Sequence, residues 1–158
     1  MASIESTVAA LYRDPAPAAY GFVLAGSVEG GEALVRDAVL WVLSRRRRLS
    51  SGPASAVRER MVAAQCAALS AGGAARSRGP VPSSLGAADR AVMELDPWVR
   101  TAMVLRYRDD RPVPDVAKAL RRSTDAVDEL LRSGREVLAA RLGVSAAEVS
   151  RMAVADGA

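Results

Sequence analysis

Apolar residues recur at helical spacing through the first part of the chain. Residues 4–12 place apolar side chains three or four positions apart, which predicts an amphipathic helix. Pro15 and Pro17 then interrupt the pattern before the apolar stretch 18–25, so two helices or one broken helix are both compatible with it. The chain therefore begins with helical structure.

Two further helices are predicted before residue 70. Residues 26–31 have the composition of a turn, and residues 32–49 carry a wide apolar stripe, which indicates a mostly buried helix with Leu34, Ala38 and Trp41 on one face. A break follows, and residues 54–69 align apolar side chains again. Together with the opening segment, these helices predict a first bundle.

The segment 70–86 is a mixture of Gly, Pro, Ser and Arg without apolar periodicity. Such a composition is typical of a flexible linker. It predicts two small helical domains, residues 1–69 and residues 87–158, joined by residues 70–86.

Helix boundaries are marked more clearly in the second half. Asp96 can cap a helix whose first residue is Pro97. Ser145 and Glu148 have the spacing of a capping box, which predicts a short final helix. The order of signals predicts several short helices.

A pair of helices lies between these two caps. Pro114 can open the first helix, and residues 121–123 supply a turn before the second. The predicted inner faces contain Val116, Ala117, Leu120, Val127, Leu130 and Leu131. This arrangement predicts a helix-turn-helix.

Composition agrees with an all-α fold and narrows the chemistry. Half of the 158 residues are hydrophobic but only 4% are aromatic, and Ala is abundant, which favours closely packed helices over a sheet. There is no His and only Cys66, so a disulfide within the chain, a Cys/His zinc site and His-dependent catalysis are excluded. No phosphate-binding glycine loop is evident, and Asp109 with Asp110 suggests a simple turn. We expect neither enzymatic activity nor a cofactor.

Charge is distributed unevenly along the chain. The formal net charge is +4, and Lys118 is the only lysine. All of the excess positive charge lies before residue 86, because the chain from residue 86 onward has 12 basic and 12 acidic residues. The N-terminus lacks a basic signal region and the apolar runs are too short to span a bilayer, which predicts a cytoplasmic protein without a membrane partner.

The second half resembles region 4 of bacterial sigma factors of the extracytoplasmic-function class. The resemblance rests on AVMELDPWVRTAMVLRY and PDVAKALRRSTDAVDELLRSGREVL, in which the Leu95-Asp96-Pro97 step, Leu105-Arg106-Tyr107, Val116-Ala117 and Val127 follow the family order. The first half is similar to region 2 of the same family through LYRDPAPAAYGFVL and EALVRDAVLWVL.

This resemblance implies a transcription protein that associates with core RNA polymerase and directs or modulates promoter-specific initiation. The implied polymerase-binding residues are Glu32, Leu34, Val35, Arg36 and Asp37. The candidate DNA-binding residues are Lys118, Arg121, Arg122, Ser123, Thr124, Arg132 and Arg135, together with Arg45, Arg46, Arg47 and Arg48. Promoter DNA and an anti-sigma factor or other regulatory protein are the further candidate partners.

Two features of the sequence favour an alternative within the same resemblance. Promoter melting uses aromatic side chains to trap unpaired bases, yet no aromatic residue occurs between Val42 and Pro97. The predicted recognition helix begins with Asp125, Asp128 and Glu129, and carboxylates repel phosphates. The alternative is a sigma-derived adaptor or decoy that binds a protein and no longer recognises promoter DNA.

Overall fold

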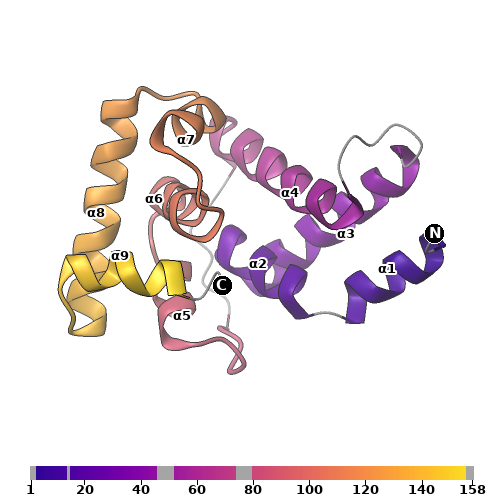
Figure 1. The fold of residues 1–158 in the computed structure, drawn as a ribbon, viewed down its shortest axis with the longest axis horizontal. Coiled ribbons are helices and arrows are strands. Elements are labelled where there is room, and N and C mark those ends of the chain that lie inside the picture. Colours follow the sequence, from indigo (N-terminus) through magenta and orange to yellow (C-terminus); the bar gives the residue numbers. More distant parts are fainter. Residues whose placement is uncertain (1–2, 14, 46–51, 74–79, 156–158) are drawn as a thin grey trace.

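The computed structural model describes residues 3–13, 15–45, 52–73 and 80–155, and every regular element in these ranges is a helix (Figure 1). The first helices are α1 (Ile4–Arg13), α2 (Pro15–Ala25), α3 (Val28–Arg45) and α4 (Pro53–Ser70). The later ones are α5 (Ala87–Met93), α6 (Pro97–Met103), the π-helical segment η2 (Val104–Arg108), α7 (Val113–Leu120), α8 (Thr124–Leu142) and α9 (Ala146–Ala155). The prediction of an all-helical chain is confirmed for these residues.

The first half differs from the sequence prediction at one boundary. The proline at position 15 starts α2, so the opening segment forms two helices and not one broken helix; both had been compatible with the sequence. The turn predicted at 26–31 is shorter in the structure, because α3 begins at Val28. Gly31 lies inside α3, where a Cβ atom would sit 2.5 Å from the backbone nitrogen of Phe22, so its missing side chain permits the close α2–α3 contact.

The predicted helix caps of the second half are confirmed. The side chain of Asp96 accepts a hydrogen bond from the Trp98 backbone N–H at 3.1 Å, and Pro97 is the first residue of α6. Ser145 and Glu148 form the reciprocal pair of a capping box: each backbone N–H donates to the other side chain, at 2.7 and 3.2 Å. These ends are determined locally by the sequence.

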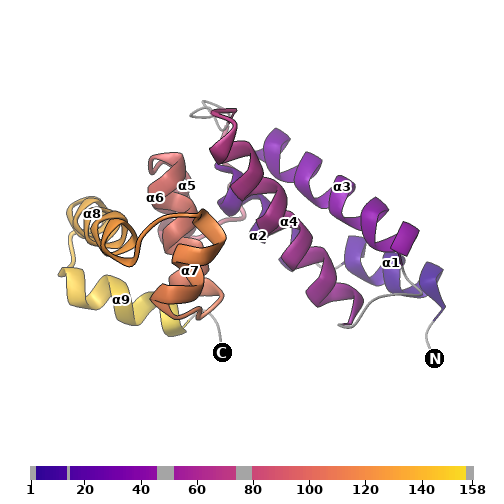
Figure 2. The ribbon, with the colours of Figure 1, turned by 90° about the horizontal axis from the view of Figure 1, so that it is seen from above.

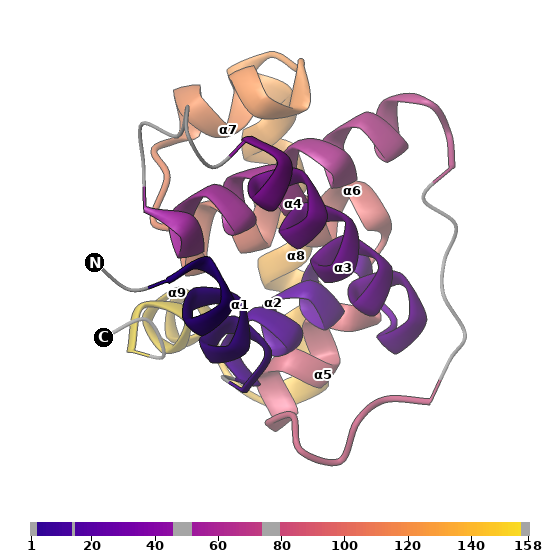
Figure 3. The ribbon, with the colours of Figure 1, turned by 90° about the vertical axis from the view of Figure 1, so that its right-hand side faces the viewer.

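The two halves of the chain pack against each other. Helix α2 contacts α5 and α6, and α4 contacts α6 and α7. Figure 2 shows α1, α3 and α4 on one side and α8 and α9 on the other. Figure 3, seen from the end of the first half, shows α2 and α4 in front of α6 and α8. In the predicted linker, residues 74–79 lie outside the described residues, whereas Leu85 is buried in the common core.

Arg100 joins the two halves at the centre of this interface. Its side chain is 1% exposed. Its guanidinium donates to the carbonyl oxygens of Leu24 at 3.1 Å and Ala25 at 2.8 Å, at the end of α2. It also donates to those of Met93 at 3.3 Å and Leu95 at 3.0 Å, at the end of α5. One side chain therefore satisfies carbonyls from both halves.

The surroundings explain why a charge is tolerated there. The last carbonyls of a helix lack intrahelical donors and carry its partial negative charge, and here two helix ends point at one cation. Burial lowers the pKa of Arg100 to about 10, which leaves the group charged at neutral pH. Gly26 adopts a positive φ of 77° beside it, and a Cβ atom there would lie 2.4 Å from the Arg100 Cζ.

A second polar contact crosses the interface. The Tyr20 hydroxyl donates to Asp109 Oδ2 at 2.8 Å, and the Asp109 side chain is only 5% exposed. Arg58 of α4 lies 3.7 Å and Arg111 lies 3.8 Å from this carboxylate. The chain does bend at Asp109, as expected, but its carboxylate has a further role, because it is buried between a phenol of α2 and two arginines.

We predict that Arg100→Met destabilises the chain by about 2–4 kcal/mol, because the carbonyls at the ends of α2 and α5 lose their donors while remaining buried. Urea unfolding of the full chain measures this change. Arg90→Met is the matched control, since Arg90 is exposed on α5. Equal stabilities of the two variants would contradict the role given to Arg100.

We also predict that Tyr20 contributes a loss of stability as the pH rises above about 10, the ordinary pKa of a tyrosine. Burial, reinforced by the negative charge of Asp109, raises the pKa of Tyr20 in the folded chain. The folded chain therefore keeps a proton that the unfolded chain loses, at a cost of up to about 1.4 kcal/mol per pH unit. Urea unfolding between pH 8.5 and 11 should show a shallower decline in Tyr20→Phe, and identical slopes would contradict the prediction.

Candidate nucleic-acid interface

Helices α7 and α8 are joined by the turn that the sequence predicted. Arg121 closes α7 in the left-handed conformation, with φ of 53°, and the Arg122 N–H donates to the Ala117 carbonyl at 3.0 Å. Ser123 then caps α8, because its Oγ accepts a hydrogen bond from the Ala126 N–H at 3.1 Å. Pro114 occupies the first turn of α7, as expected. The candidate residue Ser123 thus has a structural role at the start of α8.

The two helices bury their apolar faces and leave polar side chains outside. Val116, Leu120, Val127 and Leu131 are buried, whereas Leu130 is half-buried against the core. The outer face of α8 contains exposed Thr124, Asp125, Asp128 and Glu129. The part of α8 predicted to meet DNA is therefore accessible, and its first turns are acidic.

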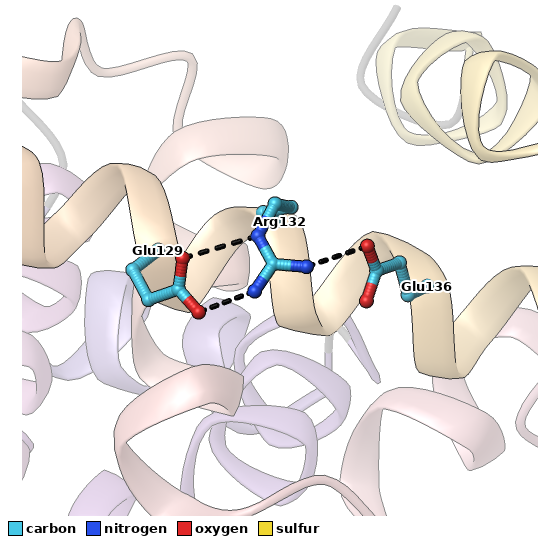
Figure 4. Close-up of polar contacts among 3 residues, drawn as sticks. All are labelled: Glu129, Arg132 and Glu136. Atoms are coloured by element: carbon cyan, nitrogen blue, oxygen red, sulfur yellow. Dashed lines mark hydrogen bonds and ion pairs between the residues drawn. The ribbon is translucent and has the colours of Figure 1, made fainter.

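Arg132 is the candidate cation on this face, and two carboxylates of the same helix hold it (Figure 4). Its Nε donates to Glu129 at 3.0 Å, its Nη2 donates to the other oxygen of Glu129, and its Nη1 donates to Glu136 at 2.6 Å. These hydrogen bonds lower the pKa of Glu129 and raise the pKa of Arg132, so the charges persist at neutral pH. The group carries a net negative charge, which repels a phosphate backbone.

Two other candidate cations also contact the protein itself. The guanidinium of Arg122 lies over the Trp98 ring, 4.2 Å from its centroid. Arg135 is half-buried and donates to the Tyr107 hydroxyl at 2.8 Å. These contacts hold the two guanidiniums against the protein, while each keeps N–H donors that the contact does not use.

Lys118 and Arg121 remain available. Both are exposed and make no ion pair with the described part of the chain. They border an open groove between α4 and α7. Two cations at the turn can contact a backbone, but they do not balance the carboxylates on α8.

The candidate residues at the end of α3 are described only in part. Arg45 is exposed and lies over the Trp41 ring at 5.1 Å from its centroid, with Arg60 of α4 at 5.2 Å. Trp41 packs against the core, as predicted, and the two guanidiniums lie over its ring. Arg46, Arg47 and Arg48 lie outside the described residues, so Arg45 is the one member of the basic run that the structure describes.

The residues implied in polymerase binding all lie on α3 but not on one surface. Glu32, Arg36 and Asp37 are exposed, and Arg36 Nε donates to Asp37 at 3.3 Å. Leu34 is half-buried, whereas Val35 is buried in the core. Three of the five side chains can therefore contact a partner directly, and Val35 can do so only if the core opens.

The sequence interpretation missed the contacts of three residues, Glu136, Arg100 and Asp109. Glu136 was not singled out, although its position four residues after Arg132 and the position of Glu129 three residues before it indicate helix-surface ion pairs. The contacts that Arg100 and Asp109 make with the carbonyls and the phenol of α2 were missed, because α2 lies in the distant first half. No local spacing marks such contacts.

Known proteins and metal sites provide no further assignment. Comparison of the chain with family models, curated proteins and solved structures finds no match. Within the described ranges, no cluster of three or more Cys, Asp or Glu could hold a metal ion, and no helix is long and apolar enough to cross a membrane. The surface of α7 and α8 therefore has to be interpreted from its own chemistry.

We predict that Glu129→Gln with Glu136→Gln strengthens binding to duplex DNA at low salt, because Arg132 becomes a free cation. The slope of log affinity against log salt should steepen by about 1, the value for one added phosphate contact. Fluorescence anisotropy with a labelled duplex measures both quantities. Glu29→Gln with Glu32→Gln makes the same charge change on α3, and an equal gain in that control would show that net charge alone is responsible.

Proposed function

We propose that this chain is a sigma-factor-like transcription protein that associates with core RNA polymerase and directs or modulates promoter-specific initiation. The support comes from where the resembling residues lie. The Leu95-Asp96-Pro97 step opens α6, Leu105-Arg106-Tyr107 lies in η2, and Val116-Ala117 and Val127 form the facing sides of α7 and α8. In this proposal α7, its turn and α8 form a helix-turn-helix.

The observation that carries the proposal is the exposed outer face of a capped α8 following a three-residue turn. A helix-turn-helix protein presents its second helix in this way so that the first residues can reach a groove or a partner. Here Thr124 and Asp125 begin an accessible helix whose inner residues, Val127 and Leu131, fix its orientation. Exposed charges on α3 supply the second proposed surface, the one for polymerase.

One specific observation favours the second candidate, a sigma-derived adaptor or decoy that binds a protein and does not recognise promoter DNA. Glu129 and Glu136 neutralise Arg132, while Arg122 and Arg135 are held by Trp98 and Tyr107. A surface of this charge fits a basic protein segment better than a phosphate backbone. Both candidates belong to a cytoplasmic protein acting without a cofactor of its own.

We predict that the full chain is retained by immobilised core RNA polymerase and that Glu32→Lys with Asp37→Lys weakens retention about tenfold, because two exposed charges on α3 are reversed. Glu5→Lys with Glu59→Lys reverses two exposed carboxylates on other helices and serves as the control. Loss of binding in the control alone, or no retention of the parent chain, would contradict the proposal.

The same preparation separates the two candidates. Run-off transcription from candidate promoters should give defined start sites if the chain is a promoter-specificity subunit. Retention on polymerase without start sites, together with negligible binding to duplex DNA at low salt, would favour the adaptor. Asp128→Lys with Glu129→Ser should then increase DNA affinity if α8 faces the groove, and unchanged affinity would place the contact elsewhere.

A further inference from the structure

A pocket of about 390 Å³ lies where α2, α5, η2, α8 and α9 meet. Its walls are mostly apolar and include Val23, Val92, Met103, Leu138 and Val149. This volume falls within the range of sites that enclose a small molecule, and such sites occur preferentially between structural units. Because Val23 comes from the first half and the other residues from the second, a molecule in the pocket would contact both halves.

Two charged side chains in the wall are partly open to solvent. Arg108 Nη1 donates to Asp89 Oδ1 at 3.1 Å, and each side chain is about one third exposed, at 34% and 33%. Among the described residues, the second carboxylate oxygen of Asp89 receives no hydrogen bond. The guanidinium of Arg108 has further N–H donors besides the one used here. The pair is neutral overall and offers an acceptor beside a donor.

The backbone that supplies one wall is unusual. Val104, Tyr107 and Arg108 belong to the π-helical segment η2, and the Asp109 N–H donates to the Val104 carbonyl, five residues earlier, at 3.1 Å. The π-helical turns of proteins are rare and occur frequently at functional sites, and this one directly follows α6 and ends at the bend at Asp109. Here the irregular turn is the one that brings Arg108 to the pocket.

We propose that this pocket binds a small apolar molecule with an uncharged head group that both donates and accepts hydrogen bonds, such as a primary amide. The apolar body fills the space between Val23, Met103 and Val149. The head group donates to the open oxygen of Asp89 and accepts from Arg108, so the ion pair remains intact. A carboxylate in the same position would face the charge of Asp89. This site is independent of the transcriptional proposal and survives its failure.

Benzamide is the probe, and NMR of the full chain with ¹³C-labelled methionine methyl groups gives the readout. Met103 lines the pocket, whereas Met61 is buried in α4 outside it. We expect the Met103 signal to shift saturably with a dissociation constant on the order of a millimolar, while Met61 does not respond. Toluene, which lacks the head group, and benzoate, which is charged, should each bind about tenfold more weakly.

Two variants test the location and the head group separately. Ala88→Trp fills the pocket and should abolish the Met103 shift with the Met61 signal unchanged; Val92→Phe does the same from the α5 wall if the first variant does not fold. Asp89→Ala should weaken benzamide about tenfold and leave toluene unaffected. An absent or unsaturable Met103 shift, its persistence in the filled variant, or equal binding of the three probes would overturn the proposal.

Discussion

The arrangement of this molecule depends on a single buried cation. Arg100 lies on α6, yet its hydrogen bonds reach the carbonyl ends of α2 and α5, so the two halves share one donor group. Removing a guanidinium from water costs free energy, and only well-placed hydrogen-bond acceptors offset that cost. Hydrogen bonds are directional, whereas apolar contacts are not. Arg100 therefore fixes the angle between the halves in a way that apolar packing alone does not.

The contacts of Arg100 also affect how the two proposed surfaces, on α8 and on α3, are placed relative to each other. Tyr20 and Asp109 add a second directional contact just beyond η2, close to where α7 begins. Because α8 packs on α6 and α7, the orientation of its acidic face relative to α3 follows from these two contacts. The pocket depends on them as well, since Val23 reaches its wall only while α2 remains docked on the second half.

The sequence predicted what is determined locally. The caps at Asp96 and Ser145 follow from side chains that bond their own backbone within three residues, and the turn at 121–123 follows from the apolar positions on either side. The π-helical turn and the buried polar contacts could not be predicted in this way. Arg100 reaches Leu24 and Ala25, and Asp109 reaches Tyr20, each more than seventy residues away, and an isolated arginine in an apolar helix is ordinarily expected to face solvent.

The same distinction between local and distant partners bears on the function of α8. Sequence alone counts Arg132 and Arg135 as available cations, but in the structure Arg132 donates to Glu129 and Glu136, and one N–H of Arg135 donates to the Tyr107 hydroxyl. An arginine between two carboxylates on one helix is held by neighbours that move with it, so approaching DNA has to compete with partners already in place. A basic protein segment would likewise compete with Arg132 for Glu129 and Glu136, and meets no such competitor only at the exposed Asp125 and Asp128. The first turns of α8 therefore present more negative than positive charge at the surface, which disfavours a phosphate backbone.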